Sequence, residues 1–181
     1  MIDETGPQWA AGVCAGLHAI GCRHVVYVPD NPLSHVLRIL AARYPDIRTT
    51  LATREEEAFG IAAGLYLGGE RPAVMLQSSG LGNSLNAVTS LLLPYRIPTL
   101  MIISLRGDAG EWNSAQKPMG NALRSICDAM NVPHVTVDAG QHAESLVRQA
   151  GESAFRERWP GACLFPRGLT SVPARPARGA A

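Results

Sequence analysis

Residues 53–69 read TREEEAFGIAAGLYLGG, three carboxylates followed by a run of small and apolar side chains. Acidic side chains are favoured in the first turn of a helix, and Thr53 with Glu56 has the spacing of a capping box. Gly68 and Gly69 supply a stop signal. Because the residues after Glu57 are apolar on nearly every face, we expect a helix buried on several sides, with a carboxylate in low dielectric at its start.

The segments around this stretch alternate between strand and helix patterns, which predicts an α/β fold. We expect an open, mostly parallel sheet of about six strands with helices on both faces, because the third and fourth strands are almost continuously apolar. The predicted strands are residues 24–28, 48–51, 72–77, 99–105, 132–137 and 162–165. Besides the stretch quoted above, the predicted helices are residues 7–20, 32–44, 84–93, 119–130 and 143–158.

Four loops with polar or glycine-rich sequences follow the first four predicted strands. Asp30 follows the first strand, Glu55 the second, residues 78–83 the third and residues 106–118 the fourth. Open parallel sheets bind ligands at the carboxyl ends of their strands. We therefore expect a functional site at this edge of the sheet.

Length and composition suit one domain, residues 1–166, followed by a flexible tail, residues 167–181, rich in Gly, Pro, Ala and Arg. A net charge of +1 gives no electrostatic footprint for nucleic acid or an acidic membrane. The longest apolar stretch, residues 97–105, is too short to span a bilayer, and residues 1–7 lack the order of a secretion signal. We expect a cytoplasmic protein.

The cysteines and histidines show no metal-site spacing, so no metal site is predicted in this chain. The four cysteines lie in apolar surroundings and are expected to be buried free thiols. They are Cys14, Cys22, Cys127 and Cys163.

Three motifs carry a family resemblance: Val28-Pro29-Asp30, Arg54 to Ala58 with Gly60 to Gly64, and Gln77 to Asn83. In this order and spacing they resemble the pyrimidine-binding (PYR) domain of thiamine-diphosphate-dependent 2-oxoacid decarboxylases. Within that family the chain is most like sulfopyruvate and phosphonopyruvate decarboxylases. The resemblance covers roughly residues 6–138.

The resemblance implies roles for individual residues. Glu55 would be catalytic and bind the cofactor, by sharing a proton with the ring nitrogen N1′ of the aminopyrimidine. Asp30 would position the substrate or relay protons. The loop against the pyrimidine end of the cofactor would comprise Ser79, Gly80, Leu81, Gly82 and Asn83.

Simpler interpretations stay open for two of these motifs. The glycine loop alone is typical of a strand-to-helix turn, and Leu85 stands where a dinucleotide fingerprint needs a third glycine. Asp30 followed by Asn31 and Pro32 could simply cap a helix.

By resemblance, we assign substrate binding to Asn31 and His35, which are close to Asp30, and to residues of the loop 106–118. Arg106 and Lys117 could meet a dianionic tail such as a sulfonate or phosphonate, and Gln116 matches a loop residue of the family. The alternative for residues 106–118 is a solvated, mobile loop.

The chain lacks the Gly-Asp-Gly motif with which the family's separate diphosphate-binding (PP) domain holds diphosphate and Mg²⁺. The resemblance therefore implies half of an enzyme, with thiamine diphosphate bound between this chain and a PP-domain subunit in a heterotetramer or larger assembly. The expected activity is decarboxylation of a 2-oxoacid, releasing CO₂ and an aldehyde. The alternatives are a carboligase subunit, or a structural or regulatory module without turnover.

Overall fold

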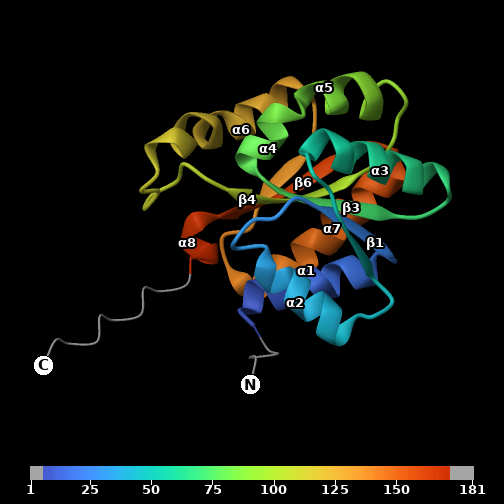
Figure 1. Ribbon diagram of the computed structural model, residues 1–181, viewed down its shortest axis with the longest axis horizontal. Coiled ribbons are helices and arrows are strands. Elements are labelled where there is room, and N and C mark those ends of the chain that lie inside the picture. Colours follow the sequence, from blue (N-terminus) through green and yellow to red (C-terminus); the bar gives the residue numbers. More distant parts are fainter. Residues whose placement is uncertain (1–5, 172–181) are drawn as a thin grey trace, which may run out of the picture.

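The computed structural model describes residues 6–171, in which six parallel strands form one sheet between two layers of helices (Figure 1). The strands lie in the order β2-β1-β3-β4-β6-β5, and every neighbouring pair is parallel. This confirms the predicted fold class. The strands are β1 His24–Tyr27, β2 Arg48–Leu51, β3 Pro72–Gln77, β4 Leu100–Leu105, β5 His134–Thr136 and β6 Gly161–Pro166.

The α-helices of the described residues cover both faces of this sheet. They are α1 Gln8–Ala19, α2 Ser34–Arg43, α3 Glu55–Leu67, α4 Ser78–Asn83, α5 Leu85–Ala87, α6 Lys117–Ala129, α7 Ala143–Glu157 and α8 Arg167–Thr170. A π-helical turn, Val88–Leu92, follows α5, and 3₁₀ turns, Ser114–Gln116 and Gly140–His142, precede α6 and α7.

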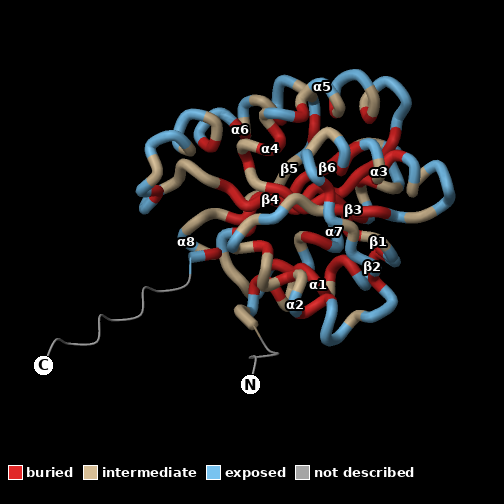
Figure 2. Tube along the Cα trace, in the orientation of Figure 1, coloured by how far each residue is buried: buried red, intermediate tan, exposed pale blue. Residues whose placement is uncertain are grey.

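Two apolar cores lie on opposite faces of the sheet. Helices α1, α2 and α7 enclose one, and α3, α4 and α6 enclose the other. The central strands β3, β4 and β6 are therefore almost entirely buried, whereas the edge strands β2 and β5 are not (Figure 2). Burial on both faces explains why β3 and β4 read as continuous apolar runs. Across the described residues, every helix falls short of the length and apolarity that a bilayer crossing requires.

The register of the sheet aligns the carboxyl ends of five strands. Tyr27, the last residue of β1, pairs with the last residue of β2, and Gln77 at the end of β3 pairs with Ser104 in β4. Leu105 pairs with Pro166, which ends β6. The segments that follow β1, β2, β3 and β4 therefore emerge at one edge, as the sequence predicted, and the segment after β6 joins them there.

The start of α3 differs from the predicted capping box. Arg54 is the N-cap residue and makes no capping hydrogen bond with its side chain. Instead, the backbone N–H of Thr53 donates to Oε2 of Glu57, at 2.6 Å. The capping-box prediction for Thr53 and Glu56 is wrong because the helix begins two residues beyond Thr53.

Burial of α3 is restricted to one face, so the prediction of a helix buried on several sides is also wrong for this chain. The buried residues are Ala58, Phe59, Ala62 and Ala63. Gly60 and Gly64 are exposed, and Leu67 is 75% exposed. A helix on one side of a sheet can bury only one face within its own chain, whatever the polarity of the other.

The expected tail begins inside the described fold. Residues 167–170 form the short helix α8, and Thr170 is buried. Residues 172–181 lie outside the described residues, so the flexible tail and the boundary at residue 166 stay predictions.

All four cysteines are buried free thiols, which confirms the prediction. Burial raises the pKa of Cys14, Cys22 and Cys163 to about 12, and that of Cys127 to about 11. Thiols with such pKa values are poor nucleophiles at neutral pH.

A substitution between α1 and α7 tests this packing. A Cβ on Gly16 would lie 2.8 Å from Cβ of Val147 and 2.9 Å from the carbonyl oxygen of Glu144. We expect Gly16→Ala to lower the free energy of unfolding by about 2 kcal/mol, because overpacking strains both helices. Gly64→Ala is the control, since a Cβ there meets nothing within 4 Å. Urea denaturation of both variants checks this, and equal stabilities would contradict it.

Candidate active site

Glu55 lies at the first turn of α3 with its side chain directly against Gly80 of α4. A Cβ built on Gly80 would lie 2.5 Å from Oε1 and 2.6 Å from Cγ of Glu55, so only glycine leaves room for this carboxylate. Glu55 is half-buried, less than the sequence predicted, because the start of α3 opens at the edge of the sheet. Within residues 6–171, no hydrogen bond or ion pair occupies its carboxylate, which leaves it available to a donor from outside.

Residues 78–83 form helix α4, so the predicted turn is wrong. The chain passes from β3 into this helix through Gln77, and Ser84 Oγ donates to the carbonyl oxygen of Gly80 at 2.7 Å. The glycines are needed for close approach and not for unusual dihedral angles. Gly80 makes room for Glu55, and a Cβ on Gly82 would lie 2.8 Å from Sδ of Met119.

Asp30 follows β1 and is a buried carboxylate that contacts β4. Its side chain is 5% exposed, and its Oδ2 accepts a hydrogen bond from Ser104 Oγ at 2.6 Å. Its Oδ1 lies 3.5 Å from Nη2 of Arg106. Because α2 begins at Ser34 with Leu33 as its N-cap residue, the alternative that Asp30 caps this helix is wrong.

Arg106 is held in place through its backbone. Its N–H donates to Ser78 Oγ at 3.2 Å, which ties the end of β4 to the start of α4. Gly107, at φ +83°, turns the chain away from the strand. Gly120 lets α6 approach closely, since a Cβ there would collide with the carbonyl group of Arg106.

A second buried carboxylate, Glu111, joins this network. Its side chain is 1% exposed and lies 3.8 Å from Nη1 of Arg106 and 3.6 Å from Nη1 of Arg167. Its Oε1 also accepts a hydrogen bond from the backbone N–H of Asn113 at 3.1 Å. Asp30, Arg106, Glu111 and Arg167 thus form a chain of alternating charges along the carboxyl ends of the strands.

Sequence reasoning missed three members of this network: Ser104, Glu111 and Arg167. A serine near the end of an otherwise apolar strand was an available signal for Ser104. Glu111 reads as one acid in a polar loop, and Arg167 as the first residue of a tail, so their pairing depends on tertiary structure.

A cavity of about 530 Å³ adjoins the network. It brings together three of the predicted substrate residues, Asn31, His35 and Arg106, and adds Arg38 and Arg167. Burial, and then the Arg38 guanidinium, lowers the pKa of His35 below its ordinary value near 6.5, so the imidazole is neutral at pH 7.

Gln116 and Lys117 lie apart from these residues. Gln116 Oε1 is 3.5 Å from Ser79 Oγ, so Gln116 lies beside α4. Lys117 is exposed at the first position of α6. The loop predicted as irregular therefore contains a 3₁₀ turn and the start of a helix.

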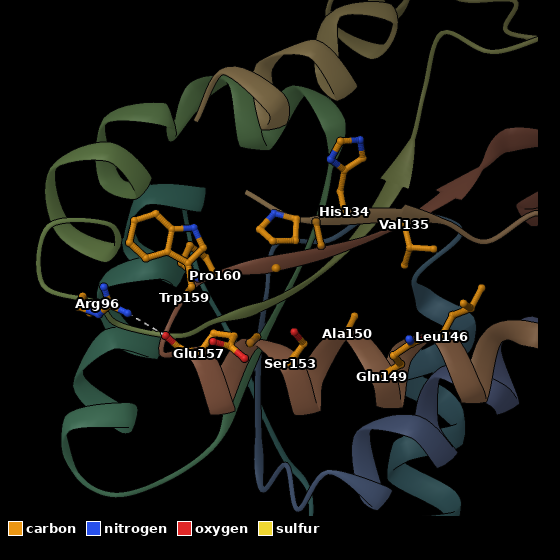
Figure 3. Close-up of a pocket in the computed structure, with 14 residues that line it drawn as sticks. Arg96, His134, Val135, Leu146, Gln149, Ala150, Ser153, Glu157, Trp159 and Pro160 are labelled. Atoms are coloured by element: carbon orange, nitrogen blue, oxygen red, sulfur yellow. Dashed lines mark hydrogen bonds between the residues drawn. The ribbon is translucent and has the colours of Figure 1, made fainter. Parts of the chain in front are cut away.

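Another cavity, of about 560 Å³, lies at the amino ends of β5 and β6 beside α7 (Figure 3). There Arg96 donates to the carbonyl oxygen of Glu157 at 3.1 Å and lies 5.8 Å from the centre of a ring of Trp159. No predicted site residue is among its described lining residues. The candidate site is therefore at the opposite ends of the strands, around Glu55 and Asp30.

Comparison with protein families gives one match of direct relevance. Residues 8–116 match the family "thiamine pyrophosphate enzyme, N-terminal TPP binding domain". The matched range includes β1 to β4 and the segments carrying Asp30, Glu55, Gly80, Arg106 and Glu111.

Curated relatives cover most of the chain. It is 41% identical to the alpha subunit of sulfopyruvate decarboxylase from Methanocaldococcus jannaschii, over 76% of this chain and 81% of that one. It is 40% identical to the corresponding subunit from Methanococcus maripaludis, over 80% of this chain and 86% of that one. Phosphonopyruvate decarboxylase from Streptomyces viridochromogenes is 32% identical, over 90% of this chain but 41% of that protein.

Among solved structures, 2-oxoglutarate:ferredoxin oxidoreductase from Magnetococcus marinus has a similar fold, with a TM-score of 0.74 and 16% identity. The match covers 91% of this chain and 29% of that one.

Proposed function

Because this chain belongs to the thiamine pyrophosphate enzymes through their N-terminal TPP-binding domain, we propose that it is the pyrimidine-binding subunit of a two-component 2-oxoacid decarboxylase. Its curated relatives with about 40% identity over most of their length are alpha subunits of sulfopyruvate decarboxylase. A substrate of that kind, a 2-oxoacid with an acidic tail, would release CO₂ and an aldehyde.

The observation that carries this proposal is the half-buried carboxylate of Glu55 against Gly80. A carboxylate free of protein partners in the described chain suits a protonated ring nitrogen such as N1′ of an aminopyrimidine. Gln77, directly before α4, also has a buried side-chain oxygen without a partner in the described residues, which a donor from a bound group could satisfy. These residues fit the pyrimidine end of thiamine diphosphate.

Glu55 would hold and share a proton at N1′, in surroundings where partial burial strengthens the interaction. When bound, thiamine diphosphate would supply the nucleophilic carbon and the electron sink that decarboxylation of a 2-oxoacid needs. Ser79 to Asn83 would pack against the pyrimidine, with Gln116 beside Ser79.

We propose that Asp30 acts on the substrate. Ser104 and Arg106 fix its carboxylate in one orientation, as the hydrogen bond of 2.6 Å and the contact of 3.5 Å show. A fixed carboxylate in a water-poor position can orient the substrate or deliver a proton during product release. We assign this role to Asp30, with Asn31 and His35 lining the adjoining cavity.

We propose that the partner is a PP-domain subunit, which binds the diphosphate and Mg²⁺, in a heterotetramer or larger cytoplasmic assembly. The relatives named as alpha subunits, which the chain matches over 81% and 86% of their length, support a divided site. The exposed face of α3, with Gly60, Gly64 and the 75% exposed Leu67, is suited to close approach by another chain. A carboligase remains the rival activity, and product analysis with several 2-oxoacids separates the two.

The divided site predicts how the isolated chain behaves. Calorimetry should show thiamine diphosphate binding at least about 100-fold more weakly to this chain alone than to the complex with its partner, because most charged contacts to the diphosphate are missing. The partner alone is the matched control. Tight binding by the isolated chain would refute the division of the site.

A further inference from the structure

The three arginines around the 530 Å³ cavity differ in how fully their charges are compensated. Arg106 faces Asp30 through Nη2, at 3.5 Å, and Glu111 through Nη1, at 3.8 Å. Both carboxylates are buried, with side chains 5% and 1% exposed. The charge of Arg106 is therefore already offset within the chain.

Arg167 and Arg38 are less compensated. Arg167 lies 3.6 Å from Glu111, a carboxylate that it shares with Arg106. Arg38 donates to the neutral hydroxyl of Ser34 at 3.0 Å, and no carboxylate in residues 6–171 lies within ion-pair distance of it. His35 adds no charge at pH 7, because burial and Arg38 lower its pKa.

The network and the cavity together hold three guanidinium groups and two carboxylates. An excess of positive charge in a partly enclosed cavity attracts an anion, and solvent screens it less than it would at an open surface. Guanidinium groups offer paired donors to sulfonate and phosphonate oxygens. A cavity of about 530 Å³ has ample room for the tail of a three-carbon acid.

We propose that Arg38 and Arg167 bind the anionic tail of the substrate, a sulfonate or phosphonate, while Arg106 stays bound to Asp30 and Glu111. This specificity role rests on the proposed function, because it assumes that the cavity beside Asp30 receives a 2-oxoacid. The proposal assigns recognition of the tail to α2 and α8, whereas the sequence pointed to the loop after β4.

The test uses the complete complex with its partner subunit, thiamine diphosphate and Mg²⁺. Arg38→Gln and Arg167→Gln are compared by steady-state kinetics with sulfopyruvate, phosphonopyruvate and pyruvate, which lacks the tail. Each variant should raise KM for at least one of the two tailed acids about tenfold, a much larger rise than in its KM for pyruvate. Arg148→Gln is the matched control, since Arg148 is exposed on α7 and pairs with Glu152 outside the cavity.

Arg167→Gln leaves Glu111 with one partner fewer, which can impair folding. Arg167→Lys is therefore included to separate a folding defect from a loss of binding. This variant keeps the charge and should retain more of the affinity for the tail than Arg167→Gln. Calorimetry with sulfoacetate, an unreactive acid with the same sulfonate group, should show weaker binding to Arg38→Gln than to the wild type.

The outcomes separate the two proposals. A wild-type complex that decarboxylates none of the acids would overturn the proposed function. A wild-type complex that is active on a tailed acid, with both glutamine variants keeping its KM, would overturn the role of Arg38 and Arg167 alone. Equal losses with the tailed acids and pyruvate would also overturn it, because they would show a general effect on the site. The relative size of the effect on the two tailed acids identifies which anion the cavity binds.

Discussion

Glu55→Gln should fold normally, assemble with its partner and bind thiamine diphosphate, yet exchange the C2 proton of the bound cofactor about 1000-fold more slowly than the wild type. The amide keeps the shape of the side chain and its contact with Gly80. It cannot carry the negative charge that, in the proposed mechanism, stabilises a proton at N1′. Hydrogen–deuterium exchange at C2, followed by NMR after acid quenching, measures this step without requiring turnover of a substrate.

Glu56→Gln is the matched control for this experiment. Glu56 is the next residue in the same helix turn, and its pKa is lowered by its own backbone N–H and by Arg54, to which it is bound at 3.3 Å. Glu55, by contrast, lies with its carboxylate against Gly80. Fast exchange in Glu55→Gln, or an equal loss in Glu56→Gln, would show that the proton is handled elsewhere.

The sequence predicted the sheet and the edge that carries the site because both depend on local patterns. Short apolar runs set apart by glycine and proline located all six strands to within two residues of the observed bounds. A parallel sheet then requires the loops after those strands to emerge at one edge. Asp30, Glu55 and Gly80 could be placed at this edge without coordinates.

The remaining features depend on contacts between distant parts of the chain. Local sequence reads Gly80 and Gly82 as turn residues, whereas their role is to let Glu55 and Met119 approach. The pairing of Glu111 with Arg167 requires α8 to return beside the loop after β4. Burial of Glu111 by the surrounding fold gives this pairing its strength, and no local pattern encodes that burial.

Gly80→Ala tests the geometry on which the proposed mechanism depends. The added methyl group would occupy the space of the Glu55 carboxylate, 2.5 Å from Oε1. The helical backbone of α4 accepts alanine, so we expect the variant to fold and the carboxylate to move by about 1 Å. A displacement of this size in a catalytic group costs about 100-fold in rate, and we expect that loss in kcat.

Gly161→Ala provides the control, because it adds the same methyl group to a buried glycine of β6, at the opposite end of the sheet, where its nearest neighbour is Cβ of Ala154 at 3.6 Å. It should keep the activity of the wild type. C2 exchange in Gly80→Ala should be slowed together with kcat, since both depend on the same carboxylate. If Gly80→Ala kept full activity, the contact between α3 and α4 would have no part in positioning Glu55. If it lost activity while C2 exchange stayed fast, the methyl group would be acting on the substrate and not on Glu55.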